Sequence, residues 1–391
     1  MLNTQIKIFL TAAFMLTQFT TGLYIAAMPT VSHYYQVSHH AIMLTMSMFL
    51  TGFAMGQLFW GMLSDYYSRK QLLLIAFSFY TLISCILCFP LNYWLYLALF
   101  LVWGFITAAM TSIGNAMVKA IYGSQASKVI AGIGIAMATG PIIGPFIGAQ
   151  LLGLFNIANI VFIVLALYAV INGIGIHWAL QINNDETYAK QTGNYERGFN
   201  KALKSLAYNP HFLYYVFSLF LLYGAFMGYV SISSFLFKTL GLSDASYGNY
   251  YLLSGISCVV GTLANRYGMK YLGPRYLVFI GTILALGGSI LLLCDHNGLV
   301  PTMLAITIFM FGFGFIVPSC KAGAMVSQPT YLGTASSVMK FLQIVGGVAF
   351  TGLLSWLDND FFNMALLILL AAVVSLMLFV LLSLYEYCNG K

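Results

Sequence analysis

One lysine lies deep inside a long apolar stretch near the end of the sequence. Residues 322–357 contain no charged side chain except that of Lys340. If this stretch crosses a membrane, a lysine at its middle costs about 2.5 to 3.5 kcal/mol, so it needs a polar cavity or a partner. Gln343 follows one helical turn later. We interpret Lys340 as an anion contact or a titrating cation; the alternative is a lysine satisfied by carbonyls and Gln343 at a helix interface.

Acidic residues are few, and none falls inside an apolar run. The 391 residues include 9 Asp and Glu, 6 His and 6 Cys, all widely scattered. Acid–base or metal-dependent catalysis needs such side chains in clusters. We therefore expect neither an enzyme nor a cofactor or metal. The sequence also lacks the G-x-x-x-x-G-K-[ST] loop of ATP-binding proteins, so an ion or substrate gradient must drive any transport.

Long uncharged runs form the elements that hold these residues. The sequence is 61% hydrophobic and has only 16 Lys and Arg. A membrane-crossing helix needs about 20 apolar residues. The runs 8–64, 71–118 and 129–184 are therefore long enough for two crossings each. With single crossings for the later runs, we predict an all-α integral membrane protein with twelve transmembrane helices.

A polar segment divides the chain into two halves. Residues 183–208 form a predicted linker between six crossings in residues 1–182 and six in residues 209–391. Its part 195–208 fits either a short helix at the membrane surface or a plain solvated connector. Most Lys and Arg fall on one side of this arrangement, which by the positive-inside rule places both termini in the cytoplasm. The net charge of +7 thus indicates orientation and not nucleic-acid binding.

A turn motif occurs twice at an offset of 200 residues. Residues 61–70, GMLSDYYSRK, align with residues 261–270, GTLANRYGMK. Glycine permits close helix approach, the acid can face a helix N-terminus or a cation, and arginine can pair with an acid. We expect a conformational latch between two related halves, with a substrate cavity at the midplane between them. The latch residues are Gly61, Asp65, Arg69, Lys70, Gly261 and Lys270.

The fifth predicted crossing combines regularly spaced glycines with prolines. Glycine at every fourth position lets two helices pack closely, and each proline removes a helix hydrogen bond and bends the helix. We expect a hinge or a tight packing seam; the alternative is packing that has no bearing on transport direction. The residues are Gly140, Pro141, Gly144, Pro145 and Gly148.

These motifs resemble the major facilitator superfamily, and within it the twelve-helix drug:proton antiporters of the bicyclomycin-resistance (Bcr/CflA) type. Residues 61–70 are similar to the superfamily's G-x-L-x-D-x-x-x-R-K/R signature, and residues 140–149 to the exporters' G-x-x-x-G-P-x-x-G-G element. The resemblance implies a monomer in the bacterial inner membrane. It also implies that the protein exports small amphipathic molecules or drugs by alternating access, in exchange for protons.

The same resemblance places the first, fourth, seventh and tenth crossings around the substrate cavity. Their residues are rich in aromatic rings and methionine, which adapt to varied apolar ligands. For each residue alone, packing within the helix bundle is the alternative. The candidate cavity residues are Gln18, Tyr24, Met28, Trp103, Thr107, Met110, Tyr223, Met227, Met310, Phe313, Lys340 and Gln343.

The sequence departs from the family where the coupled proton is usually carried. Gly22 stands where the branch has an acid in its first crossing. Because carboxylates and histidines normally carry protons within membranes, Lys340 becomes the candidate titrating group, and we expect a neutral or anionic substrate. Transport of an endogenous anionic metabolite, such as a carboxylate siderophore, is the alternative function. A sensor that has the same fold and does not transport is a further alternative function.

Overall fold

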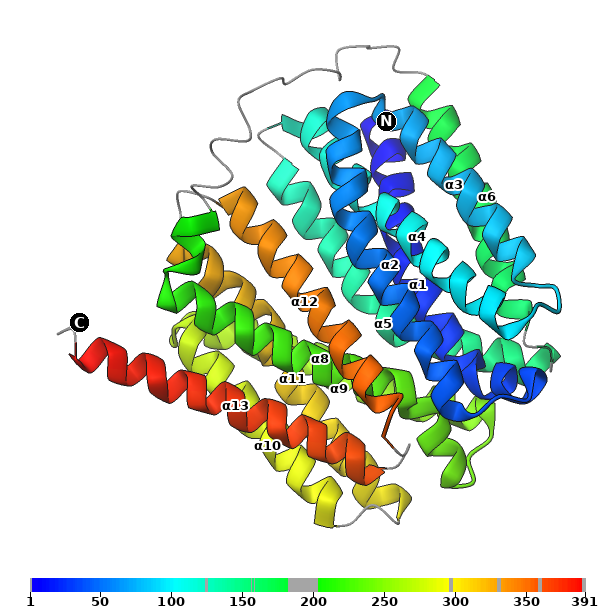
Figure 1. Cartoon of the computed structure of the whole chain (residues 1–391). Helices are drawn as coiled ribbons and strands as arrows, with labels where there is room; N and C mark the ends of the chain where they lie inside the picture. Colours follow the sequence, from blue (N-terminus) through cyan, green and yellow to red (C-terminus); the bar gives the residue numbers. More distant parts are fainter. Residues whose placement is uncertain are drawn as a thin grey trace. The chain divides into compact units, whose positions relative to one another are not determined.

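The computed structural model describes residues 2–123, 126–155, 157, 159–181, 203–294, 298–328, 332–357 and 361–388. These residues form twelve long α-helices (Figure 1). The helices are α1 (Leu2–Tyr35), α2 (His39–Tyr66), α3 (Arg69–Ile86), α4 (Tyr93–Tyr122), α5 (Ala126–Phe155), α6 (Ile160–Gln181), α8 (Pro210–Thr239), α9 (Asp244–Gly268), α10 (Pro274–Cys294), α11 (Leu299–Ser327), α12 (Leu332–Leu354) and α13 (Phe361–Cys388).

Ten of these helices are long and apolar enough to cross a membrane. The other two, α5 and α9, have 30 and 25 residues, which exceeds the roughly 20 residues that a crossing needs. The all-helical membrane fold predicted from the sequence is therefore confirmed. Of the predicted surface helix 195–208, only residues 203–208 lie in the described part, and residues 203–207 are helical.

Polar residues fix the starts of several helices. Ser38, Asn92 and Asn209 precede α2, α4 and α8, and each side chain accepts a hydrogen bond from a backbone N–H in the first turn of its helix. Such a cap satisfies a donor that the helix itself leaves unpaired. Pro210 follows Asn209, and its fixed φ suits the first helical position.

The chain divides into two compact units. Unit 1 comprises residues up to 192 together with residues 242–252, the N-terminal part of α9. Unit 2 comprises residues 193–241 and 253–391. The division predicted from the sequence, with a linker at 183–208, stays a prediction, since residues 182–202 lie outside the described part.

Aromatic rings fill the interior of each unit. In unit 1 the ring of Tyr24 lies 4.4 Å from that of Phe100, and Trp103 lies 5.3 Å from Phe100 between ring centroids. In unit 2 Phe226 stacks on Phe313 at 4.2 Å. Each ring buries a large apolar area, so these clusters hold the helices of their own unit together.

Candidate functional site

The predicted hinge glycines of α5 lie against α1. A Cβ atom placed on Gly144 would lie 2.9 Å from the Cα atom of Gly22. One turn to either side, Gly140 faces the side chain of Gln18, and Gly148 faces the backbone of α1. Glycine is needed at this seam because the two backbones approach more closely than a side chain permits. Whether the seam also works as a hinge stays a prediction.

Gly22 is part of this seam. A Cβ atom placed on it would lie 2.8 Å from Gly144 Cα and 2.9 Å from Pro145 Cδ. A carboxylate at position 22 would therefore force α1 and α5 apart. Pro141 and Pro145 both lie inside α5. The position where the family resemblance leads us to expect an acid is thus occupied by a glycine that lies in the close contact between α1 and α5.

An equivalent seam joins α8 and α12 in unit 2. Gly224 and Gly346 lie 202 residues after Gly22 and Gly144, respectively. A Cβ atom on Gly346 would lie 2.2 Å from the carbonyl oxygen of Phe220. The sequence analysis missed this pair, although the shared offset of 202 residues is visible in the sequence. The two seams extend the internal repeat beyond the turn motif.

The first copy of the predicted latch joins α2 to α3. Gly61 approaches Ser112 of α4, since a Cβ atom on the glycine would lie 3.2 Å from the serine Oγ. Asp65 lies in the last turn of α2, but its side chain lies outside the described part. Arg69 and Lys70 begin α3 and are half-buried, and Arg69 Nε has no partner among the described residues. The latch role of these residues stays a prediction.

The second copy of the latch is tied to α11. A Cβ atom on Gly261 would lie 2.2 Å from the carbonyl oxygen of Phe311. Asn265, which aligns with Asp65, is 2% exposed and donates hydrogen bonds to the Phe315 carbonyl, at 3.0 Å, and to a serine hydroxyl of α11. Lys270 Nζ lies 5.6 Å from a tyrosine ring centroid. The amide of Asn265 thus fixes α9 against α11, a contact that the sequence alone does not indicate.

The candidate cavity residues of unit 1 pack mainly among residues of that unit. Tyr24 OH lies 2.5 Å from Thr45 Oγ1, and Trp103 Nε1 donates to Ser84 Oγ at 3.1 Å. Thr107 Oγ1 donates to the carbonyl one turn earlier. These contacts favour the packing alternative, and a role in substrate binding stays a prediction for these residues. Tyr24, Met28, Trp103, Thr107 and Met110 are all buried.

The candidate residues of unit 2 come together as a mixed polar and aromatic cluster. Tyr223 of α8 lies beside Gln343 of α12. The Tyr223 ring lies 6.3 Å from that of Phe313 and 5.9 Å from that of Phe226 between centroids. The cluster therefore offers flat apolar rings beside a hydroxyl and an amide. Met227 and Met310 are buried nearby in the same helices, α8 and α11.

Lys340 has a second lysine as a neighbour. Lys321 lies six residues before the end of α11, and Lys340 eight residues after the start of α12. At a rise of 1.5 Å per residue, Lys321 lies about 9 Å along the helix from the end of α11, and Lys340 lies about 12 Å from the start of α12. The two ammonium groups repel each other electrostatically. Neither has a hydrogen-bond or ion-pair partner among the residues that the structure describes.

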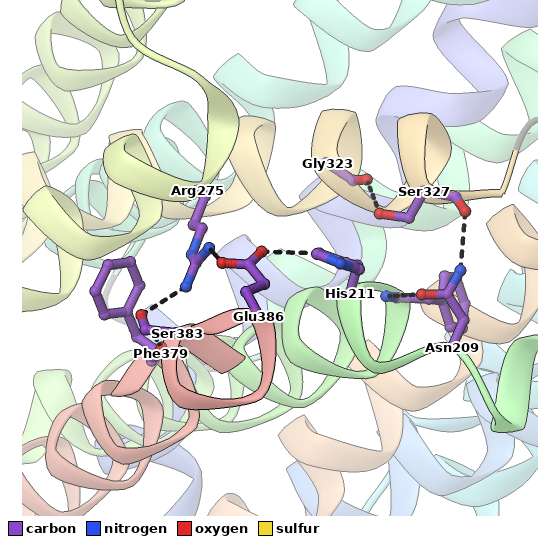
Figure 2. A network of polar contacts seen from close by, with 9 residues as sticks. Asn209, His211, Arg275, Gly323, Ser327, Phe379, Ser383 and Glu386 are labelled. Carbon is purple, nitrogen blue, oxygen red and sulfur yellow. Dashed lines mark hydrogen bonds and ion pairs between the residues drawn. The ribbon is translucent and has the colours of Figure 1, made fainter. Parts of the chain in front are cut away.

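A charged network lies where α8 and α10 begin and α13 ends (Figure 2). Arg275 donates to the carboxylate of Glu386 and, at 2.6 Å, to Ser383 Oγ. His211 Nδ1 lies 3.7 Å from the other carboxylate oxygen of Glu386. The Arg275 guanidinium also lies 4.8 Å from the Phe379 ring. The sequence analysis missed this network, whose only signal is an acid directly after the last apolar run.

No group of three or more His, Cys, Asp or Glu side chains in the described residues could hold a metal ion. The sequence was also compared with models of known protein families. Residues 10–351 match the family model described as Major Facilitator Superfamily. The chain belongs to the Major Facilitator Superfamily.

Other members resemble the chain over most of its length. The uncharacterized MFS-type transporter YdgK of Bacillus subtilis is 23% identical over 364 residues, which cover 91% of this chain and 90% of that protein. A bicyclomycin resistance protein homolog of Haemophilus influenzae is 23% identical over 358 residues, which cover 88% of this chain and 87% of that protein. The chain is therefore a membrane transporter.

A solved structure supports the superfamily fold. The crystal structure of the nucleoside transporter NupG matches with a TM-score of 0.74 and covers 97% of this chain and 99% of that chain. The sequence identity is 14%, so this likeness shows the fold alone. Together with the twelve long helices, it confirms the predicted all-α, twelve-helix fold of the superfamily.

Proposed function

We propose that the protein is a secondary active transporter that exports small amphipathic organic molecules by alternating access. The observation that carries this proposal is the cluster of Tyr223, Phe226, Phe313 and Gln343 in unit 2. Flat rings accommodate varied apolar ligands, while a hydroxyl and an amide orient them. The similarity to a bicyclomycin resistance protein homolog over most of the chain supports a drug-like substrate.

The glycine seams support alternating access. In unit 1 the α1–α5 seam contains Gly22 and Gly144, and in unit 2 the α8–α12 seam contains Gly224 and Gly346. Helices in such close backbone contact resist separation, which suits a transporter whose halves rock as rigid bodies. Export is the proposed direction because residues 140–149 resemble the exporter element.

Protons are the proposed coupling ions, with Lys340 as their carrier. No Asp or Glu occurs inside the apolar runs, so Lys340 is the charged side chain nearest to the middle of a crossing. We further propose that the protein is a monomer of the bacterial inner membrane with both termini in the cytoplasm. The relatives of Bacillus and Haemophilus and the distribution of Lys and Arg support this location.

Expression in a bacterial host deleted for its own drug pumps tests the export proposal. Cells that produce the protein should tolerate higher concentrations of some neutral or anionic compounds in a broad drug panel. A Tyr223→Ala variant, produced at the same level in the membrane, should lose at least part of this tolerance. Unchanged tolerance to every compound would count against drug export.

Transport of an endogenous anionic metabolite is the second candidate function, and the lysine pair of unit 2 favours it. A comparison of metabolites inside and outside deletion and parent cells tests this alternative. An anion that accumulates inside the deletion strain and is depleted outside would identify the substrate. Identical metabolite profiles would count against this second function.

A further inference from the structure

We propose that Lys321 and Lys340 form an anion-binding site in unit 2, and that the preferred substrate is a carboxylate attached to a flat apolar ring system. This inference rests on the proposed transport function and names its substrate class. Two observations support it. The described residues offer the two lysines no counter-ion, and Gln343, one helical turn after Lys340, belongs to the aromatic cluster.

The two lysines lie at similar depth within their helices, and their charges interact. α11 ends and α12 begins on either side of residues 328–331, and each lysine lies about 9 to 12 Å inside its helix from that end. Lys321 is exposed and Lys340 is half-buried, although both belong to membrane-crossing helices. Both side chains therefore keep some exposed surface while they lie well within the length of a crossing.

The carboxylates of the protein do not neutralise this pair in the described residues. Lys340 lies 14 residues, or about 21 Å of helix, before the end of α12, and Asp358 follows that end in the sequence. Glu386 is the only acidic residue whose side chain the structure describes. Figure 2 shows that Arg275 and His211 already bind both of its carboxylate oxygens.

A bound anion would relieve an unfavourable arrangement. Two like charges that lack partners repel each other, and the repulsion is stronger in apolar surroundings than in water. A carboxylate placed between them would attract both ammonium groups and form charge-assisted hydrogen bonds. The lysines thus favour an anionic ligand over a neutral molecule of the same shape.

The aromatic cluster specifies the rest of the ligand. Gln343 follows Lys340 by three residues, so the two side chains share one face of α12. Gln343 lies beside Tyr223, and Tyr223 lies beside Phe226 and Phe313. A ligand whose carboxylate reaches Lys340 can therefore place a ring system against this cluster.

Binding of a matched pair of probes tests the proposal. The full-length protein in phosphatidylcholine nanodiscs is titrated with 2-naphthoate and with 2-naphthamide, its neutral analogue of the same shape. Naphthoate should bind about tenfold more tightly than naphthamide. Lys321→Gln and Lys340→Gln should each weaken naphthoate binding about tenfold and leave naphthamide binding unchanged. Lys204→Gln, which removes an exposed lysine of the same unit, is the matched control and should change neither affinity.

Two further measurements test whether misfolding or lipid binding accounts for the naphthoate results. Lys340→Arg keeps the positive charge and should keep naphthoate binding, which shows that a loss in Lys340→Gln reflects charge and not misfolding. If the lysines bind lipid headgroups instead, phosphatidylglycerol in the nanodiscs will displace naphthoate. That result, or equal affinity of the wild type for naphthoate and naphthamide, would overturn the proposal.

Drug tolerance distinguishes this proposal from the proposed function. Tenfold selectivity for naphthoate in a protein that confers no tolerance would uphold the anion site and remove support from drug export. Tolerance to neutral compounds without any preference for naphthoate would uphold export and overturn the anion site. The two proposals can therefore fail separately.

Discussion

Lys340 places a positive charge within a membrane-crossing helix, and its ammonium group has no partner in the described part of the chain. Lysine can release its proton, whereas arginine stays protonated under all physiological conditions. A single lysine can therefore bind an anion in its charged form, and it can take up and release the coupled proton. This combination would let a transporter whose apolar runs contain no carboxylate be coupled to protons.

We predict that Lys340→Arg retains substrate binding and loses proton-coupled turnover, whereas Lys340→Ala loses both. Substrate binding in nanodiscs and transport driven by a pH gradient in proteoliposomes measure the two properties separately. The wild type should show pH-dependent transport that both variants lack. Transport that neither substitution changes would show that Lys340 is a lysine satisfied at a helix interface.

Arg275 and Glu386 are 19% and 24% exposed, so removal of one charge leaves the other partly buried and unpaired. We predict that Glu386→Gln lowers the free energy of unfolding of unit 2 by about 1.5 to 3 kcal/mol. Arg275→Gln combined with Glu386→Gln should recover part of this loss, because two amides can pair without a buried charge. Thermal unfolding in detergent measures the effect, and an unchanged melting temperature for Glu386→Gln would contradict it.

Lys340 and the pair of Arg275 and Glu386 show what the sequence can and cannot predict about single residues. Lys340 stands out because it interrupts an apolar stretch. The contact between Arg275 and Glu386 joins residues 111 positions apart, and no local pattern indicates which helix ends meet. The sequence therefore predicts an isolated charge better than a charged pair.

At the scale of helices, the sequence predicts that a glycine seam exists but does not predict which helix it contacts. Glycine spacing in α5 predicts a close helix contact. It does not identify α1 as the partner, so the sequence alone indicates a missing acid at Gly22 and not its contact with α5. The matched seam in unit 2 was visible as a common offset of 202 residues, yet glycine is too frequent in this chain for that offset to stand out.

We predict that Gly144→Ala and Gly346→Ala each cost about 1 to 3 kcal/mol of stability and reduce transport. The added methyl group would lie 2.9 Å from Gly22 Cα in the first variant and 2.2 Å from Phe220 O in the second. Gly287→Ala in α10 is the control, because a Cβ atom there meets nothing within 4 Å. If all three variants unfold and transport as the wild type does, the close contacts are not required.

At the scale of the whole chain, hydropathy predicts the crossings, whereas the residues of the substrate cavity stay a prediction. Runs of apolar residues set the helix count because each crossing needs about 20 of them. The family resemblance predicts that Trp103 and Tyr24 line a cavity, and the structure shows them hydrogen-bonded to Ser84 and Thr45 within unit 1. In a membrane helix most faces are apolar, so residue type alone does not indicate which face meets a substrate.

The proposed orientation of the protein in the membrane can be tested by thiol labelling. With both termini in the cytoplasm, the turn at Ser68 lies inside and the turn at Ser243 outside. Ser243→Cys should react with an impermeant thiol reagent in intact cells, and Ser68→Cys only after the membrane is opened. The exposed native thiols of Cys85, Cys294 and Cys388 must first be replaced by serine. Ready labelling of Ser68→Cys in intact cells would reverse the assigned orientation.

Transport into everted membrane vesicles tests the central proposal most directly. Vesicles that contain the protein should accumulate a compound selected by the drug panel or the metabolite comparison when a pH gradient, acidic inside, is imposed. An uncoupler that collapses the gradient should release the compound, and vesicles with Lys340→Arg should not accumulate it. Equal accumulation in vesicles with and without the protein, under the same gradient, would contradict proton-coupled export.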